Sequence, residues 1–243
     1  VEFDALPDLG NEAVPTKTPR KDGVTNGHGC GHNLIGSGAI GAAIALKNHM
    51  EKEGIPITIK VFGCPAEELL AGKNYMAQAG AFDGLDACLH HHPGPINAAA
   101  NFHSTAATDL WIEWQGTAAH AAQSPWDGRS SVQAAQLFLH GVDMMREHIL
   151  PTCRMHYYIA DGGKAVNPVP EYAKVVFRFR ATSAETVAKN IAWVKDIAKG
   201  AGLATQTKEK ITTITGIYDS MPNTVMAERV TEHLNRYFPI AWT

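Results

Sequence analysis

Candidate metal ligands occur in a glycine-rich segment, residues 27–33, which reads Gly-His-Gly-Cys-Gly-His-Asn. Cys30 and His32 lie two residues apart in this segment, just before a stretch with helical spacing. Glycine lets the backbone turn tightly enough for both side chains to converge on one ion. A thiolate and an imidazole suit Zn²⁺ or a related borderline ion. The segment therefore indicates a metal site, although a glycine-rich turn with a buried cysteine and a capping histidine would read the same way.

Two adjacent acids, Glu67 and Glu68, follow a β-branched run at residues 57–62. Open α/β sheets place their sites at the carboxyl ends of strands. Adjacent side chains there point in different directions, so one acid can bind a metal while the other acts as general base on a water molecule. The alternative is a pair of acids in the first turn of a helix, where the helix dipole favours negative charge.

Three consecutive histidines, His90, His91 and His92, precede Pro93 at the end of a short apolar stretch. Side chains alternate along a strand, so at most two of the three can face the same site. The glycine-rich segment, the acid pair and this triplet follow successive elements of an α/β pattern. We therefore predict that the three segments meet at one metal site.

The elements that would position these segments alternate between strands and helices. The expected elements are a strand end over 1–10, a loop over 11–32, a helix over 33–53, a strand over 57–62, a helix over 67–79 and a strand over 87–91. This order predicts an α/β catalytic domain with a mostly parallel sheet, which we assign to residues 1–103.

The pattern changes after residue 103. Strands are expected over 105–115, 154–161, 172–181 and 204–217, with helices over 131–148 and 184–199. This β-α-β-β-α-β order is the split ferredoxin-like motif, and it predicts a small inserted lid or dimerisation domain over 104–221. A helix over 227–237 would begin a return to the catalytic domain, assigned to 222–243.

The composition is that of a globular protein, with 45% hydrophobic and 19% charged residues in a chain of 243. The net charge is −3 and no run of Lys and Arg occurs, so neither nucleic acid nor a membrane surface is an expected partner. Four widely spaced cysteines without a Cys-x-x-Cys pair indicate reduced thiols in a cytoplasmic protein. The chain lacks an initiator Met and ends on apolar residues, which predicts an internal piece of a longer protein.

Several motifs together resemble those of the aminoacylase and glutamate-carboxypeptidase-like metallo-amidohydrolases. The similarity is to the branch with a Cys-Gly-His motif, which includes amino-acid-conjugate hydrolases and aminobenzoyl-glutamate hydrolase. The matching segments span essentially the whole chain: residues 2–7, 27–43, 63–68, 92–93, 116–120 and 162–170.

The resemblance implies a role for each matching position of the metal site. It implies four metal ligands, Cys30, His32, Glu68 and His92, with Cys30 placed to bridge two ions when both are present. Glu67 matches the general base. Asp4 matches a carboxylate that orients a ligand histidine, and on its own it could equally be a turn residue.

Three residues of the second domain also acquire roles from the resemblance. His120 matches a histidine that polarises the scissile carbonyl in the partner subunit's site, although alone it would read as a surface histidine. Asn167 matches an amide that contacts substrate, and otherwise a turn residue. Arg180 matches a carboxylate-binding arginine by its spacing of 13 residues from Asn167, and Arg178 on the same strand is the competing choice.

The implied activity is metal-dependent hydrolysis of the amide bond of an N-acyl amino acid such as aminobenzoyl-glutamate, with one or two Zn²⁺ or Mn²⁺ ions. The alternatives are an aminoacylase or dipeptidase with another substrate, and a non-catalytic binding protein that keeps the fold. The resemblance also implies a homodimer through the lid domain, with a second kind of subunit as a further possibility. The family has one more ligand histidine, late in its catalytic domain, for which this chain has no counterpart. The function is therefore assigned to the complete protein.

Overall fold

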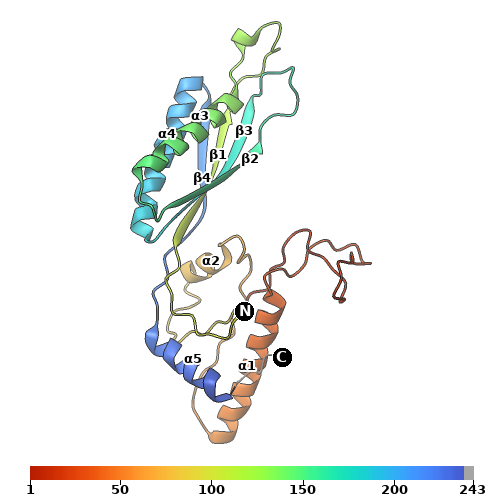
Figure 1. Cartoon of the computed structure of the whole chain (residues 1–243), viewed down its shortest axis with the longest axis vertical. Helices are drawn as coiled ribbons and strands as arrows, with labels where there is room; N and C mark the ends of the chain where they lie inside the picture. Colours follow the sequence, from red (N-terminus) through yellow and green to blue (C-terminus); the bar gives the residue numbers. More distant parts are fainter. Residues whose placement is uncertain (238–243) are drawn as a thin grey trace. The chain divides into compact units, whose positions relative to one another are not determined.

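The computed structural model describes residues 1–237, which form two compact units (Figure 1). Val1–Ala98 belong to the first unit and Ala99–Asn235 to the second. The division follows residue 98, whereas the sequence pattern predicted it at 103, and the roles given to the domains stay predictions. Residues 238–243, the end of the predicted third segment, lie outside the described residues. Within residues 1–237, no helix is long and apolar enough to cross a membrane.

The second unit is built on a four-stranded antiparallel sheet with the strand order β2-β3-β1-β4. Its strands are β1 (Ala106–Gln115), β2 (Arg154–Asp161), β3 (Tyr172–Ala181) and β4 (Lys208–Ile217). The helices α3 (Ser131–Met145) and α4 (Ala184–Thr205) pack against this sheet. The order of these elements along the chain is β-α-β-β-α-β, which confirms that part of the sequence prediction.

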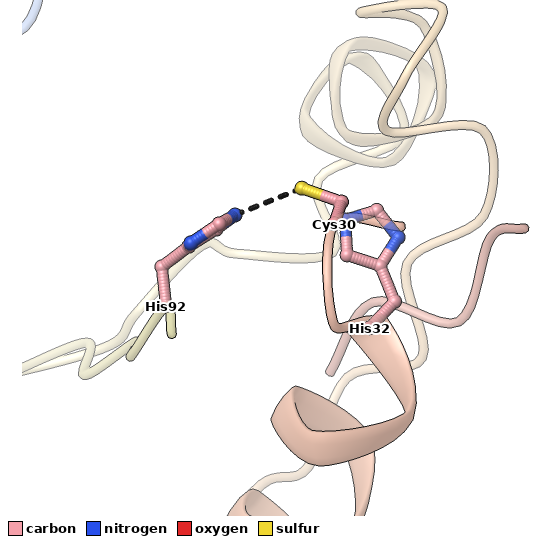
Figure 2. Close-up of side chains that lie close together, drawn as sticks. All are labelled: Cys30, His32 and His92. Atoms are coloured by element: carbon pink, nitrogen blue, oxygen red, sulfur yellow. Dashed lines mark hydrogen bonds between the residues drawn. The ribbon is translucent and has the colours of Figure 1, made fainter. Parts of the chain in front are cut away.

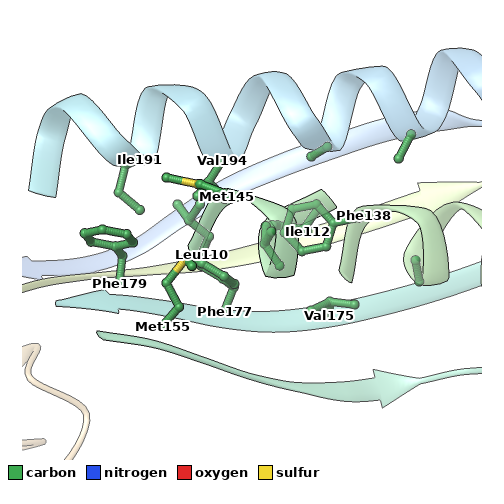
Figure 3. Packing of buried hydrophobic residues seen from close by; sticks show 14 of the residues in the cluster. Leu110, Ile112, Phe138, Met145, Met155, Val175, Phe177, Phe179, Ile191 and Val194 are labelled. Atoms are coloured by element: carbon green, nitrogen blue, oxygen red, sulfur yellow. The ribbon is translucent and has the colours of Figure 1, made fainter. Parts of the chain in front are cut away.

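The core of the second unit lies between the sheet and its two helices (Figure 3). Alternate residues of β3 are buried, which is the pattern of a strand with one face against a core. Phe177 and Phe179 project from that face, and Phe138 of α3 stacks edge-to-face on Phe177 with ring centroids 5.9 Å apart. This packing makes β3 a rigid support for the side chains on its other face.

Local capping signals fix the helix ends of the second unit. The hydroxyl oxygens of Ser130 and Ser183 accept backbone N–H groups at the starts of α3 and α4. The predicted start of the last strand, residue 204, is wrong, because α4 continues to Thr205 and ends where Gln206 adopts a left-handed conformation. Two short 3₁₀ helices, Pro125–Asp127 and Arg146–His148, complete this part of the chain.

The first unit has two helices, α1 (His32–Glu53) and α2 (Gly72–Gln78), joined by irregular segments. The second predicted helix, 67–79, is too long. Residues 67–70 form a turn instead, since Ala66 and Leu70 have positive φ angles of 53° and 54°. The α1 helix starts after Gly31 and ends at Gly54, both in the left-handed conformation that favours glycine.

The predicted strands at 57–62 and 87–91, and with them the parallel sheet, are not formed within residues 1–98. The described pairing there consists of isolated bridges, Glu2 with Cys64 in parallel and Leu6 with Gly27 in antiparallel orientation. A β-branched run favours an extended backbone, but a strand also needs a neighbour to pair its N–H and C=O groups. Without such a sheet, α1 and residues 55–61 line an open apolar groove.

The last helix, α5 (Thr224–Tyr237), begins three residues before its predicted start at 227. The Asn223 side chain explains the difference, because its Oδ1 accepts the backbone N–H of Met226. Asparagine in this position caps the first turn of a helix. Most of α5 belongs to the second unit.

Candidate metal centre

Gly31 brings the glycine-rich loop against the histidine triplet. Its φ of 93° is left-handed, and a Cβ added there would lie 2.9 Å from Cγ of Pro93. Glycine therefore fits this position for both conformational and steric reasons. Cys30 precedes this turn, and His32 follows it as the first residue of α1 with only 1% of its surface exposed.

Cys30, His32 and His92 lie together at this turn (Figure 2). One ligand atom from each lies within 4.8 Å of the others, and Cys30 Sγ is 3.1 Å from His92 Nε2. His92 Nδ1 lies 2.8 Å from the carbonyl oxygen of Pro93, which can only accept a hydrogen bond. His92 therefore carries its proton on Nδ1 and presents the lone pair of Nε2 to Cys30, as metal-binding histidines do.

The two acids of the 67–70 turn approach the same histidine. His32 Nε2 lies 3.5 Å from Glu67 Oε2 and 3.8 Å from Glu68 Oε1. Asp4 Oδ2 accepts the backbone N–H of Glu68 at 3.1 Å. Asp4 thus positions the backbone of the acid pair, whereas the sequence prediction placed it behind a ligand histidine.

Glu2 is a member of this cluster that the sequence prediction missed. Its carboxylate is buried, its Oε2 lies 3.5 Å from His32 Nε2, and its Oε1 pairs with Lys73 and with His90. A usable signal was present, because Glu2 and Asp4 are two residues apart in an extended run and so point to the same side. The triplet also behaves as alternation requires, since His90 and His92 reach the cluster while His91 lies beside Gly38 of α1.

Five polar atoms of the cluster are buried and lack a hydrogen-bond partner among the described residues. They are Glu2 Oε2, Asp4 Oδ1, both ring nitrogens of His32, and Glu68 Oε1. Buried polar groups are normally satisfied, and each exception costs about 1–3 kcal/mol. Such a concentration indicates that the cluster is built around something other than protein atoms.

A divalent cation fits these atoms. Separations of 3.5–3.8 Å between His32 Nε2 and the acids are too long for hydrogen bonds. They are close to the edge of a ligand tetrahedron, about 3.3–3.5 Å when each ligand lies about 2.0–2.1 Å from Zn²⁺. Two groups of candidate ligands share His32: Cys30 with His92 on one side, and Glu2 with Glu67 on the other.

The charges of the cluster shift the pKa values of two of its members. Burial raises the pKa of the Glu67 carboxyl, and the negative charge of Glu2 raises it further against the opposing effect of Lys73. Burial also raises the pKa of the Cys30 thiol, with added effects from the neighbouring glutamates. Without a cation, Cys30 is therefore a protonated thiol at neutral pH.

Cation binding at pH 7 is expected to release a proton from Cys30, because the thiolate and not the thiol is the ligand. Affinity should then rise with pH, by about tenfold per unit for each proton released, up to the pKa of the thiol. Calorimetry of Zn²⁺ binding in phosphate and in Tris measures this as a difference in heat, since the two buffers differ in ionisation enthalpy. Cys30→Ser should reduce the difference. Equal heats in both buffers for the unmodified protein would contradict the role of Cys30.

The other three predicted residues lie in the second unit. His120 and Asn167 are on adjacent segments, joined by a bridge between His120 and Pro168 and by a 2.8 Å hydrogen bond from the Ala121 N–H to the Asn167 carbonyl. Arg180 lies on β3 opposite Ala107 of β1. The structure brings His120 and Asn167 together and places Arg180 elsewhere on the same sheet.

The choice between Arg180 and Arg178 follows from their contacts. Arg178 forms two hydrogen bonds of 2.6 Å with the carboxylate of Asp109 on β1, which occupies its guanidinium. Among the described residues, no ion pair involves Arg180. Arg180 is therefore the arginine of this pair that can bind a ligand carboxylate.

Comparison with known proteins gives a consistent result. The family model described as Peptidase family M20/M25/M40 matches residues 1–232. The chain is 35% identical, over 99% of its length, to one of the two kinds of p-aminobenzoyl-glutamate hydrolase subunit of Escherichia coli (strain K12), and 34% identical, over 96%, to Xaa-Arg dipeptidase of Mus musculus. It covers 50% of each of these proteins, so it spans about half the length of the curated relatives it matches.

A solved structure also supports the fold. A putative aminohydrolase from methicillin resistant Staphylococcus aureus superposes with a TM-score of 0.69, covering 97% of this chain and 64% of that one. The sequences are 19% identical, so this likeness concerns the fold alone.

Proposed function

Because the chain belongs to the peptidase family M20/M25/M40, we propose that the complete protein hydrolyses the amide bond of an N-acyl amino acid in a metal-dependent reaction. The observation that carries this proposal is the group of unpartnered buried atoms around His32 Nε2, with a carboxylate of raised pKa, Glu67, beside it. A structural metal site would need no base, and this argues against a binding protein without catalysis.

The cation would be held by Cys30, His32, Glu68 and His92. Bound there, it supplies a Lewis acid that polarises the amide carbonyl and lowers the pKa of the attacking water. The mixture of thiolate, imidazole and carboxylate ligands suits one or two ions of Zn²⁺ or Mn²⁺. Asp4 supports this arrangement by fixing the backbone at Glu68.

Glu67 is the proposed general base. It takes the proton of the attacking water and delivers it to the departing nitrogen. Its side chain is 30% exposed, so it can reach both solvent and substrate. A pKa above the ordinary value makes it a better proton acceptor than a solvated carboxylate while leaving it ionised near neutral pH.

The remaining residues would bind substrate. Arg180 grips the free carboxylate of the amino-acid part, Asn167 contacts the amide region, and His120 donates to the carbonyl oxygen as negative charge develops there. In a substrate with one carboxylate next to one amide bond, all three groups must act within a few ångströms of each other.

The position of these residues along β3 favours two copies of the chain. Arg180 lies eight residues from Tyr172, a distance of about 26 Å along a strand. Asn167 and His120 lie beyond the Tyr172 end, where the β1–β3 hydrogen bonding continues from Gly116 N to Glu171 O. One chain therefore cannot place all three on one small substrate. We propose a homodimer in which Arg180 of one chain and His120 and Asn167 of the other serve the same site.

Two substrate classes follow from the relatives, one hydrolysing p-aminobenzoyl-glutamate and the other Xaa-Arg dipeptides. Both substrates are amides of an amino acid with a free carboxylate. We propose aminobenzoyl-glutamate or a related N-acyl amino acid first, and a dipeptide as the second candidate. The first relative is one of two kinds of subunit in its organism, which also makes a second kind of subunit a possible partner. The cytoplasmic location stays a prediction.

A panel of substrates tests the proposal. The complete protein, loaded with Zn²⁺ or Mn²⁺, is incubated with aminobenzoyl-glutamate, other N-acyl amino acids and Xaa-Arg dipeptides, and the released amine is measured. We expect release from at least one class and none after chelation. A protein that binds the cation and hydrolyses no member of the panel would contradict the proposed function.

Replacing Arg180 with Met is expected to raise KM by about 10- to 150-fold, the equivalent of losing a charged hydrogen-bonded contact of about 1.5–3 kcal/mol. The matched control is Arg178→Met on the same strand face. Because Arg178 pairs with Asp109, its replacement should lower the melting temperature and leave KM nearly unchanged. Steady-state kinetics and thermal unfolding of both variants measure the difference. An unchanged KM in Arg180→Met would remove Arg180 from the substrate site.

A further inference from the structure

Glu2 is held in the cluster by the backbone on both sides. It forms the parallel bridge with Cys64, and the Cys64 N–H donates to the Val1 carbonyl at 2.6 Å. Its side chain has only 4% of its surface exposed. A carboxylate is almost never buried to this extent without a partner for its charge.

The two oxygens of this carboxylate have different surroundings. Oε1 pairs with the ammonium group of Lys73 and lies 3.2 Å from His90 Nε2. Oε2 has no hydrogen-bond partner among the described residues, and it lies 3.5 Å from His32 Nε2. One oxygen is thus anchored, and the other is directed at the metal cluster.

The carboxylate is ionised in this position. Burial alone would raise its pKa, but the hydrogen bond and charge of Lys73, together with the charges of His90 and His32, outweigh burial and lower the pKa of Glu2. Glu67 and Glu68 also lie within 3.8 Å of the same histidine nitrogen. Lys73 offsets one of these three negative charges, so a cation among them would be strongly favoured.

A hydrogen bond does not explain the separation between Glu2 and His32. A distance of 3.5 Å exceeds the 2.7–3.2 Å usual for N–H···O bonds. It is close to the ligand–ligand distance of about 3.3–3.5 Å around a tetrahedral ion. Glu2, His32 and Glu67 each offer an atom within 4.8 Å of the others.

We propose that Glu2 is a further ligand of the metal centre, and that with His32 it marks a second cation position on the carboxylate side of the cluster. This inference rests on the metal centre of the proposed function, in which Glu67 keeps its role as base. Cys30 and His92 make the opposite side rich in sulfur and nitrogen, which suits Zn²⁺. The carboxylate side suits a harder ion, Mn²⁺ in particular.

The test compares Glu2→Gln with the unmodified complete protein in cation binding, without substrate. Mn²⁺ and Zn²⁺ are titrated separately against a competing chelator, and bound metal is counted by mass spectrometry after gel filtration. We expect Glu2→Gln to lose one ion per chain, or to bind the weaker ion at least tenfold less tightly, with the larger effect on Mn²⁺. Unchanged ion number and affinity would overturn the proposal.

Two further variants separate ligation from packing. Lys73→Met removes the anchor but keeps the Glu2 carboxylate, so it should retain the ion number; a loss equal to that of Glu2→Gln would overturn the ligand role. Glu2→His restores a ligand atom without the Lys73 pair and should recover the second ion, which also decides the matter if Glu2→Gln folds poorly. Failure of Glu2→His to bind that ion, in a folded protein by circular dichroism, counts against the proposal.

The control variant is Glu51→Gln. Glu51 is also paired with a lysine, Lys47, but both are 63% exposed and Glu51 lies near the far end of α1, about 28 Å from His32 along the helix. It should bind both ions as the unmodified protein does. Failure of the two proposals is distinguishable: a protein that binds both ions but hydrolyses nothing refutes only the function, and equal ion binding by Glu2→Gln refutes only the ligand.

Discussion

Replacing Glu67 with Gln in the complete protein is expected to lower kcat by about 10²- to 10⁴-fold, the usual contribution of a general base. Glutamine has nearly the same shape but cannot accept the proton of the attacking water. The cation should stay bound, because the proposed ligands are Cys30, His32, Glu68 and His92. Turnover on the best substrate of the panel and metal content are measured on the same preparation. An unchanged kcat would rule out Glu67 as the base.

The neighbouring residue provides a matched control. Glu68→Gln changes the adjacent acid in the same way, but Glu68 is a proposed ligand, so this variant should lose cation affinity and regain part of its activity in excess metal. Glu67→Gln should not respond to added metal. If both variants behave alike, the division of the pair into base and ligand is wrong.

The pH profile gives a second readout of Glu67. A general base works only when deprotonated, so activity falls as the pH drops through its pKa. Burial and the charge of Glu2 raise that pKa above the ordinary 4.5. The acidic limb of kcat/KM should therefore lie above the pH expected for a solvated glutamate, and it should be absent from the residual activity of Glu67→Gln.

Two inactive variants are expected to restore each other's activity when they share one dimer. The first, Glu67→Gln, lacks the base. The second, His120→Ala, lacks the proposed donor to the carbonyl oxygen and should lose about 10²- to 10³-fold in kcat. If His120 serves the site of the partner chain, a mixed dimer has one intact site and one doubly defective site. Its turnover should be about half that of the unmodified dimer.

Co-expression of the two variants with different affinity tags, followed by purification on both tags, isolates the mixed dimer. The physical reason for the expectation is the separation of Arg180 from His120 and Asn167 along β3. The control is a mixed dimer in which one chain carries both substitutions and the other carries none. It has two singly defective sites and should stay nearly inactive. Inactivity of the first mixed dimer, or failure to recover any doubly tagged protein, would contradict the proposed dimeric site.

Short motifs in the sequence predicted much of the ligand cluster. Cys30 and His32 are two residues apart, and the turn at Gly31 that directs them depends on local backbone conformation. Glu67 and Glu68 are adjacent, so any turn that exposes one places the other nearby. The second unit was predicted almost to the residue, since alternating burial in β3 and the serine caps of α3 and α4 are properties of contiguous sequence.

Contacts between distant residues could not be predicted in this way. Glu2 pairs with Lys73 and His90 across 71 and 88 positions, and nothing in the local pattern specifies such partners. The run at 57–62 has strand composition but no strand beside it in its unit, as far as residues 1–98 are described, because pairing depends on another segment. The contact of Arg178 with Asp109, which leaves Arg180 to bind a ligand, likewise follows from the register between β1 and β3.

The sequence by itself therefore determined which chemical groups are present and how each short motif turns: a thiol, imidazoles and paired acids at metal-binding spacing, and a β-α-β-β-α-β unit after them. Only the tertiary structure decided which of these groups face the same nitrogen of His32, which arginine can bind a ligand, and that His120 and Arg180 lie toward opposite ends of β3. The physical reason is that spacing and conformational preference act over a few residues, whereas burial of charge and strand register are set by segments far apart in the chain.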